Sequence, residues 1–246
     1  MIHFLLNDTA VKVEKYAPHL TVLDWIRTTT GNRGTKEGCA TGDCGACTLL
    51  VGERVESPLG PSWHYKAMNS CLLMLGNVHG KHVVTVEAVT PMLQPALEDL
   101  HPVQRAMVEC HGSQCGFCTP GIVMSLMALY QNHSAYPGRK VVIEALGGNL
   151  CRCTGYNPIL AAAEKAFDYP RADNDWAEQA EQFKQNLSNH QTPFLQHQAH
   201  RFYLPQTLDA LLALKDQYPH AQLVAGATDL AIDYSQNLAS PEIIIS

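Results

Sequence analysis

Eight of the nine cysteines fall into two sets whose spacing could hold iron and sulfide. In the first set, four residues separate the first two cysteines, two separate the next two, and a long gap precedes the fourth. In the second set, a C-x-x-C pair is followed after a long gap by a C-x-C pair. Four thiolates can hold one [2Fe–2S] cluster. We therefore expect two clusters, which together would carry single electrons, on two ligand sets: Cys39, Cys44, Cys47 and Cys71; and Cys115, Cys118, Cys151 and Cys153.

The surroundings of these cysteines favour clusters over zinc ions. The first three lie in a loop of small residues from Gly38 to Cys47, with the C-x4-C-x2-C spacing of plant-type ferredoxins. Glycines let backbone N–H groups point at sulfur atoms, and such hydrogen bonds tune the reduction potential. Structural zinc sites more often pair two C-x-x-C units, and neither cysteine set has that spacing. A zinc ion is the alternative occupant for either set. Cys110 lies outside both spacings, and we expect it to be a buried structural thiol.

Length, charge and hydropathy narrow the class of protein. A chain of 246 residues suggests two domains or three small ones. The net charge of −6 and the absence of a basic run argue against a nucleic-acid partner. The longest apolar stretches are about half of a membrane span, and the first residues lack the basic region of a signal peptide. We therefore expect a cytoplasmic protein without a membrane partner, in which clustered cysteines indicate metal binding over disulfides.

Other chemical groups show no comparable pattern. The twelve histidines lack metal-binding spacing, and we expect His79 and His82 at the surface of a turn. No Ser/His/Asp set and no paired carboxylates suited to acid–base chemistry are found. We therefore assign no catalytic residue to this chain.

Turn and capping residues divide the chain into four parts. Residues 1–89 are predicted to be rich in strands, with one short helix capped by Thr21. Residues 90–168 are predicted to be helical, with Thr119 as one N-cap, and Cys118 and Cys153 just before helices, where the N-terminus favours anions. Residues 169–195 are polar and predict a linker; residues 196–246 predict a helix, a strand that enters a tight turn, and a final strand.

Four motifs, in this order, resemble the iron–sulfur region of the molybdenum hydroxylases. This family contains the xanthine dehydrogenases, aldehyde oxidases and carbon monoxide dehydrogenases. The resemblance implies an α+β fold: a β-grasp plant-type [2Fe–2S] ferredoxin domain at 1–89, then a four-helix [2Fe–2S]-binding domain at 90–168. It also supports Cys71 as the fourth ligand of the first cluster. The motifs are Gly34–Cys39 with Cys44–Cys47, Asn69–Leu72, Gln114–Gly121, and Gly148–Tyr156.

A further resemblance lies near the C-terminus, where eight residues are similar to the turn that binds the FAD pyrophosphate in this family. It implies that 196–246 is the truncated start of an α+β FAD-binding domain, and we expect the isolated chain to bind FAD weakly or not at all. Ala227 departs from the glycine or asparagine more usual at its position. The eight residues are Leu223, Val224, Ala225, Gly226, Ala227, Thr228, Asp229 and Leu230.

The combined resemblance implies an electron-transfer subunit of an enzyme, similar to the small iron–sulfur and FAD subunit of a bacterial xanthine dehydrogenase. A large partner subunit would carry molybdopterin and oxidise xanthine or hypoxanthine, and electrons would pass through the clusters to FAD and then NAD. Gln114 and Cys153 match family positions that face the partner's molybdopterin. For Gln114, the alternative is a buried amide that bonds to its loop. The alternatives for the chain are another enzyme of the family, acting on aldehydes or carbon monoxide, or a stand-alone electron carrier.

Overall fold

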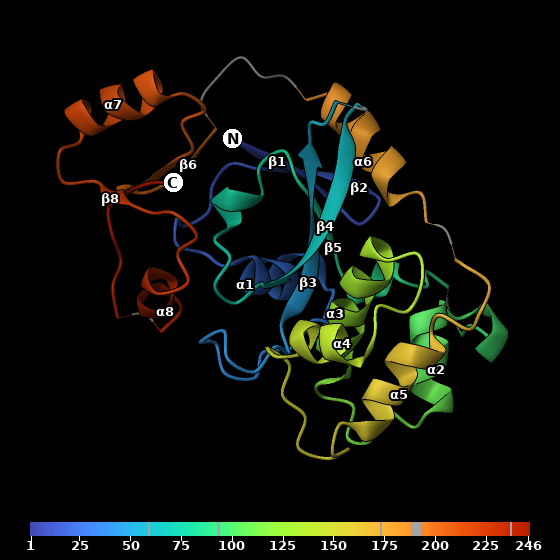
Figure 1. Cartoon of the computed structure of the whole chain (residues 1–246). Helices are drawn as coiled ribbons and strands as arrows, with labels where there is room; N and C mark the ends of the chain where they lie inside the picture. Colours follow the sequence, from blue (N-terminus) through green and yellow to red (C-terminus); the bar gives the residue numbers. More distant parts are fainter. Residues whose placement is uncertain (59, 93, 173, 188–192, 237) are drawn as a thin grey trace.

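The computed structural model describes residues 1–58, 60–92, 94–172, 174–187, 193–236 and 238–246. A five-stranded sheet in the order β2-β1-β5-β3-β4 forms its centre (Figure 1). β1 pairs antiparallel with β2 and parallel with β5, and β3 pairs antiparallel with β4 and β5. The strands are β1 (Ile2–Leu6), β2 (Thr9–Val13), β3 (Thr48–Val55), β4 (Ser62–Asn69) and β5 (His82–Val84).

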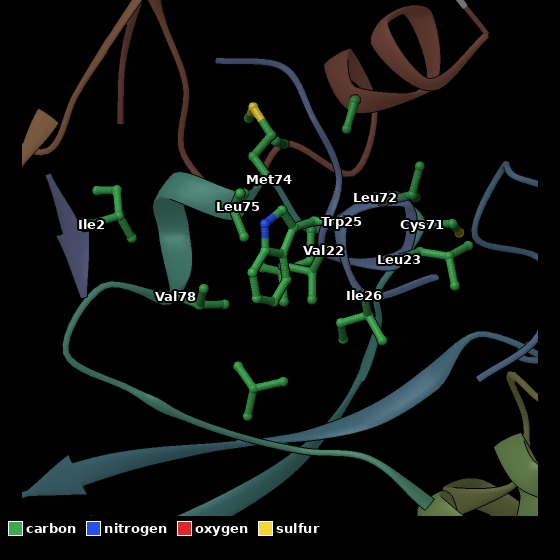
Figure 2. Close-up of a cluster of buried hydrophobic side chains, with 14 of the residues drawn as sticks. Ile2, Val22, Leu23, Trp25, Ile26, Cys71, Leu72, Met74, Leu75 and Val78 are labelled. Carbon is green, nitrogen blue, oxygen red and sulfur yellow. The ribbon is translucent and has the colours of Figure 1, made fainter. Parts of the chain in front are cut away.

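One face of this sheet is covered by a short helix, α1 (Val22–Trp25), which continues as one π-helical turn over Ile26–Thr30. The Thr21 hydroxyl accepts a hydrogen bond from the Asp24 N–H at 3.1 Å, which confirms the predicted cap. The helical segment ends at Gly31 with φ +80°, a backbone angle that glycine adopts without strain. Figure 2 shows the apolar side chains of this segment gathered with those from the stretch after β4, among them Val22, Trp25, Ile26, Met74, Leu75 and Val78.

Four helices form a second layer, and α3 packs directly against β3 and β4. Ten consecutive residues of α3, from 121 to 130, are buried. This helix therefore lies at the centre of a second hydrophobic core, which the helical layer forms against the sheet. The predicted N-cap at Thr119 is wrong, because Thr119 is the first helical residue and Cys118 is the cap. The Thr119 hydroxyl instead hydrogen-bonds with that of Ser113 at 2.6 Å. The helices are α2 (Pro102–Glu109), α3 (Thr119–Asn132), α4 (Arg139–Ala145) and α5 (Asn157–Lys165).

The predicted linker at 169–195 contains a helix, α6 (Trp176–Gln185), so that prediction is wrong for this stretch. Trp176 is 5% exposed and its ring lies 5.9 Å from that of Tyr65 on β4. Glu181 accepts hydrogen bonds from Arg54 and from the Trp63 indole, both at 3.0 Å. Residues 173 and 188–192 of the expected linker lie outside the described residues.

A second sheet, in the order β6-β7-β9-β8, occupies the C-terminal part. It packs on the first core, since Leu195, Phe202 and Ile244 belong to the same buried cluster as Phe4. In Figure 1 this part lies on the opposite side of the central sheet from α2 and α5. The elements are β6 (Phe194–His197), β7 (His200–Tyr203), α7 (Leu208–Gln217), β8 (Gln222–Leu223), α8 (Leu230–Ser235) and β9 (Ile243–Ile245).

The structure therefore has the mixed α+β character that we expected, while the four domain boundaries stay predictions. Among the described residues, no helix combines the length and apolar character needed to cross a lipid bilayer.

We predict that Trp176→Ala lowers the free energy of unfolding by about 3–5 kcal/mol, because it opens a cavity between α6 and β4. Chemical denaturation of the purified chain measures this loss. Glu178→Ala, at an exposed position of the same helix, should change the free energy by less than about 0.5 kcal/mol. Equal effects of the two substitutions would show that α6 is not packed on the sheet.

Candidate metal centres

The first cysteine loop joins the helical segment after α1 to β3. Hydrogen bonds from Lys36 N to Ala46 O and from Thr48 N to Gly45 O, both at 3.1 Å, hold it in place. Ala40, Gly42 and Gly45 have φ of +55°, +81° and +69°, so the loop folds back on itself within a few residues. The loop thereby turns its cysteine side chains inward.

The structure brings Cys71 to this loop, although it lies 24 positions after Cys47 in the sequence. The two Sγ atoms lie 3.3 Å apart, and both residues are buried. The Ser70 hydroxyl donates to the Cys47 carbonyl at 2.7 Å and fixes the two segments together. The hydrogen bond between the thiols lowers the pKa of Cys47 to about 7 and raises the pKa of Cys71.

Cys39 and Cys44 form the other half of the first set, and their thiols interact with each other. Burial raises the pKa of both thiols. At Cys39, hydrogen bonds from Thr41 outweigh burial and lower the pKa to about 6. The Thr41 backbone N–H is one of these donors, with N 3.4 Å from Sγ. The loop therefore stabilises a thiolate at Cys39.

The second set lies where α3 begins and where the chain passes from α4 to α5. The thiols interact in two pairs, Cys118 with Cys151 and Cys115 with Cys153. Burial raises the pKa of Cys118 to about 12. At Cys151, burial acts in the same direction, but hydrogen bonds, including one with the Thr154 hydroxyl at 3.2 Å, lower the pKa to about 7.

The eight thiols therefore meet as four pairs. Within the part of the chain that the structure describes, no three His, Cys, Asp or Glu side chains converge closely enough to hold a single metal ion. A [2Fe–2S] cluster has two irons and takes two cysteine ligands on each, so two pairs supply one cluster. This donor set fits the two expected clusters.

The remaining predicted positions differ in exposure. Gln114, Cys115 and Cys153 are exposed, so the alternative of a buried Gln114 amide is wrong. Two large apolar side chains beside them are also exposed, Phe117 by 49% and Leu150 by 56%. Cys110 is half-buried and not fully buried as expected. The reason is its position just after the last turn of α2, at the edge of the helical core.

The predicted FAD turn runs from β8 into α8. Gly226 and Ala227 both have positive φ, +75° and +64°, which explains why a glycine or asparagine would suit position 227 better than alanine. A cavity of about 510 Å³ separates Gly226 and Thr228 from Thr41 and Asp43 of the first cysteine loop. The Ser235 hydroxyl of α8 donates to the Ala40 carbonyl at 2.8 Å. The turn and the cysteine loop are therefore neighbours.

Sequence reasoning missed one buried polar residue beside the cysteines. Asn149 is 5% exposed and bonds both to the first cysteine loop and to α3, although it stands within the motif Gly148–Tyr156. A polar residue two positions before a predicted metal ligand was the available signal, but its partners are more than 20 positions away in the sequence.

Comparisons with known proteins agree with this geometry. Residues 85–164 match the family profile described as the [2Fe-2S] binding domain. Xanthine dehydrogenase of Blastobotrys adeninivorans is 46% identical over 162 residues, which are 65% of this chain and 11% of that protein. Aldehyde oxidase 3 of Rattus norvegicus is 33% identical over 284 aligned residues, which span 99% of this chain and 21% of that protein. The chain thus spans about a tenth to a fifth of the length of these two relatives.

Solved structures give the same result. A chain in the crystal structure of quinoline 2-oxidoreductase from Pseudomonas putida 86 is 30% identical, with a TM-score of 0.55 over 75% of this chain and 96% of that chain. The aldehyde oxidoreductase from Desulfovibrio desulfuricans is also 30% identical, with a TM-score of 0.55 over 67% of this chain and 16% of that one. With its [2Fe–2S]-binding domain and these relatives, the chain belongs to the molybdenum hydroxylase family, as an iron–sulfur segment.

Proposed function

We propose that this chain passes electrons from a molybdopterin site on a partner subunit, through two [2Fe–2S] clusters, to FAD and finally to NAD. The observation that carries this proposal is the meeting of eight thiols in four pairs, which are the ligands we propose for the two clusters. Each cluster, when bound, takes up and releases one electron at a time. The chain itself would contribute to an oxidoreductase as a subunit and would break no substrate bond.

The residues around the thiols have a separate role, which is to set the reduction potential of the bound clusters. The N–H of Thr41 donates to the Cys39 sulfur, and the Thr154 hydroxyl forms a hydrogen bond with the Cys151 sulfur. Hydrogen bonds to sulfur stabilise the thiolate and affect the potential of the bound cluster. Burial of Cys47 and Cys71 keeps water away from these two sulfurs of the first set.

The exposure of residues beside the second cysteine set supports the proposed direction of electron flow, from the second set to the first. Cys115 and Cys153 lie at the surface with Gln114, Phe117 and Leu150, where we propose that the partner subunit presents molybdopterin. Interface cores are rich in apolar side chains, and Phe117 and Leu150 supply such side chains here, beside the exposed Arg152. At the other end, the cavity between the first cysteine loop and the turn around Gly226 supports FAD bound by residues 223–230.

The proposed substrate of the whole enzyme is a purine such as xanthine or hypoxanthine. The xanthine dehydrogenase of Blastobotrys adeninivorans, at 46% identity, supports this choice. An aldehyde is the second candidate, because the match with aldehyde oxidase 3 of Rattus norvegicus spans 99% of the chain, including its C-terminal part. We propose a cytoplasmic location for the complex.

Metal analysis tests the proposal first. The chain purified without oxygen should contain about four irons and about four acid-labile sulfides, because each of the two clusters holds two of each. Colorimetric iron and sulfide assays on the same sample give these values. Stoichiometric zinc without labile sulfide would reject the clusters and leave the zinc alternative.

Single substitutions should separate the two clusters. We expect Cys44→Ser to abolish the electron paramagnetic resonance signal of the first cluster alone, and Cys118→Ser to abolish that of the second alone. Cys110→Ser is the matched control and should leave both signals, since its thiol belongs to neither set of pairs. Loss of both signals from one substitution in a folded chain would contradict two separate sites.

Gln114→Ala should slow the reduction of the clusters by substrate in the complex with the partner subunit, by about two- to tenfold, as for one lost hydrogen bond. Stopped-flow absorbance measures the rate, and Gln182→Ala on the exposed face of α6 is the control. Unchanged rates and unchanged molybdenum content in Gln114→Ala would remove this residue from the proposed site.

A further inference from the structure

Asn149 is a buried polar side chain at the junction between the two cysteine sets. It is 5% exposed. Its Nδ2 donates to the Gly45 carbonyl at 3.2 Å and to the Thr48 hydroxyl at 3.3 Å. Its Oδ1 accepts a hydrogen bond from the Ser125 hydroxyl at 2.6 Å. Both donor hydrogens and the acceptor of the amide are therefore in use.

These partners come from two different parts of the fold. Gly45 and Thr48 belong to the first cysteine loop and the start of β3, whereas Ser125 lies on α3. The Thr48 hydroxyl itself donates to the Gly45 carbonyl at 2.7 Å, so it is free to accept from Asn149. The two donor bonds thus tie the segment just before Cys151 to the first cysteine loop, and the acceptor bond ties the same side chain to α3.

The backbone segments that meet at this junction approach each other unusually closely. A Cβ added to Gly45 would lie 2.2 Å from the Gly148 carbonyl oxygen, and one added to Gly121 would lie 2.0 Å from the Gly45 carbonyl oxygen. The Leu150 N–H donates to the Cys44 carbonyl at 2.9 Å. Leu150 directly precedes Cys151 of the second set, and Cys44 belongs to the first set. This one hydrogen bond therefore joins the two sets.

We propose that Asn149 is a positioning residue that fixes the separation between the two cysteine sets. The inference rests on the proposed function, since a fixed separation matters when both sets hold clusters and electrons must cross between them. A buried polar side chain whose donors and acceptor all form hydrogen bonds holds its neighbours in one arrangement. Loss of its donors leaves the buried acceptor groups of those neighbours without a partner. The amide therefore keeps the Leu150–Cys44 bond closed.

Two variants separate positioning from general stability. Asn149→Asp keeps the size of the side chain and still accepts from Ser125, but it cannot donate to Gly45 and Thr48 as a carboxylate. Ser125→Ala is the matched control, because it removes a buried hydrogen bond within the helical layer and leaves the two donor bonds of Asn149 in place. Asn149→Ala removes both donors whatever the protonation state, and provides a second test.

The first readout is hydrogen exchange of the peptide that contains the Leu150 amide, measured by mass spectrometry on the full chain. We expect exchange to become about tenfold faster in Asn149→Asp and Asn149→Ala, which corresponds to about 1.4 kcal/mol of local stability. Exchange in Ser125→Ala should stay as in the unmodified chain. This readout does not depend on any activity.

The second readout is the magnetic splitting between the two reduced clusters in low-temperature electron paramagnetic resonance spectra. We expect the splitting to be lost or narrowed in the Asn149 variants, with iron and sulfide content unchanged, and to be kept in Ser125→Ala. Unchanged exchange and splitting in both Asn149 variants, or equal changes in Ser125→Ala, would overturn the proposal. An unmodified chain without cluster signals would overturn the proposed function instead, while the exchange comparison would still decide the role of Asn149.

Discussion

The contact between the first cysteine loop and the segment before Cys151 is the constraint on which the rest of the structure depends. The two cysteine-bearing segments approach so closely that a Cβ at Gly45 or at Gly121 would collide with backbone atoms, which explains the glycines at these two positions. Each side is anchored to a regular element, since β3 begins directly after Cys47 and α3 directly after Cys118. Because α3 packs against β3, the two anchors are in direct contact.

The C-terminal part extends the same arrangement. Its buried side chains join the core beneath α1, and Gly76 leaves room for the ring of Phe202, since a Cβ there would lie 2.2 Å from that ring. The bond from Ser235 to the Ala40 carbonyl then holds α8 against the first cysteine loop. The proposed FAD turn, the first cysteine set and the second set therefore follow one another through the molecule, which is the order that the proposed electron path requires.

Local signals in the sequence predicted much of this. The cysteine spacings, the Thr21 cap and the proline and glycine residues at helix ends indicated the elements that carry the cysteines. The helix α6 was missed because its buried positions, Trp176 and Ala180, are surrounded by polar residues. His82 was expected at the surface, yet it is fully buried, because strand pairing brings Tyr65 to its Nδ1 at 2.9 Å. The roles of His82 and Asn149 depend on partners far away in the sequence, which a local pattern does not contain.

Electron paramagnetic resonance of the unmodified chain, reduced with dithionite at low temperature, tests the central claim most directly. The account predicts two distinct signals, each integrating to about one spin per chain, because each of the two clusters takes up one electron. It also predicts that the two signals split each other, since the cysteine sets are in contact through Leu150 and Cys44. A single signal, or no signal from a chain that contains iron, would contradict it.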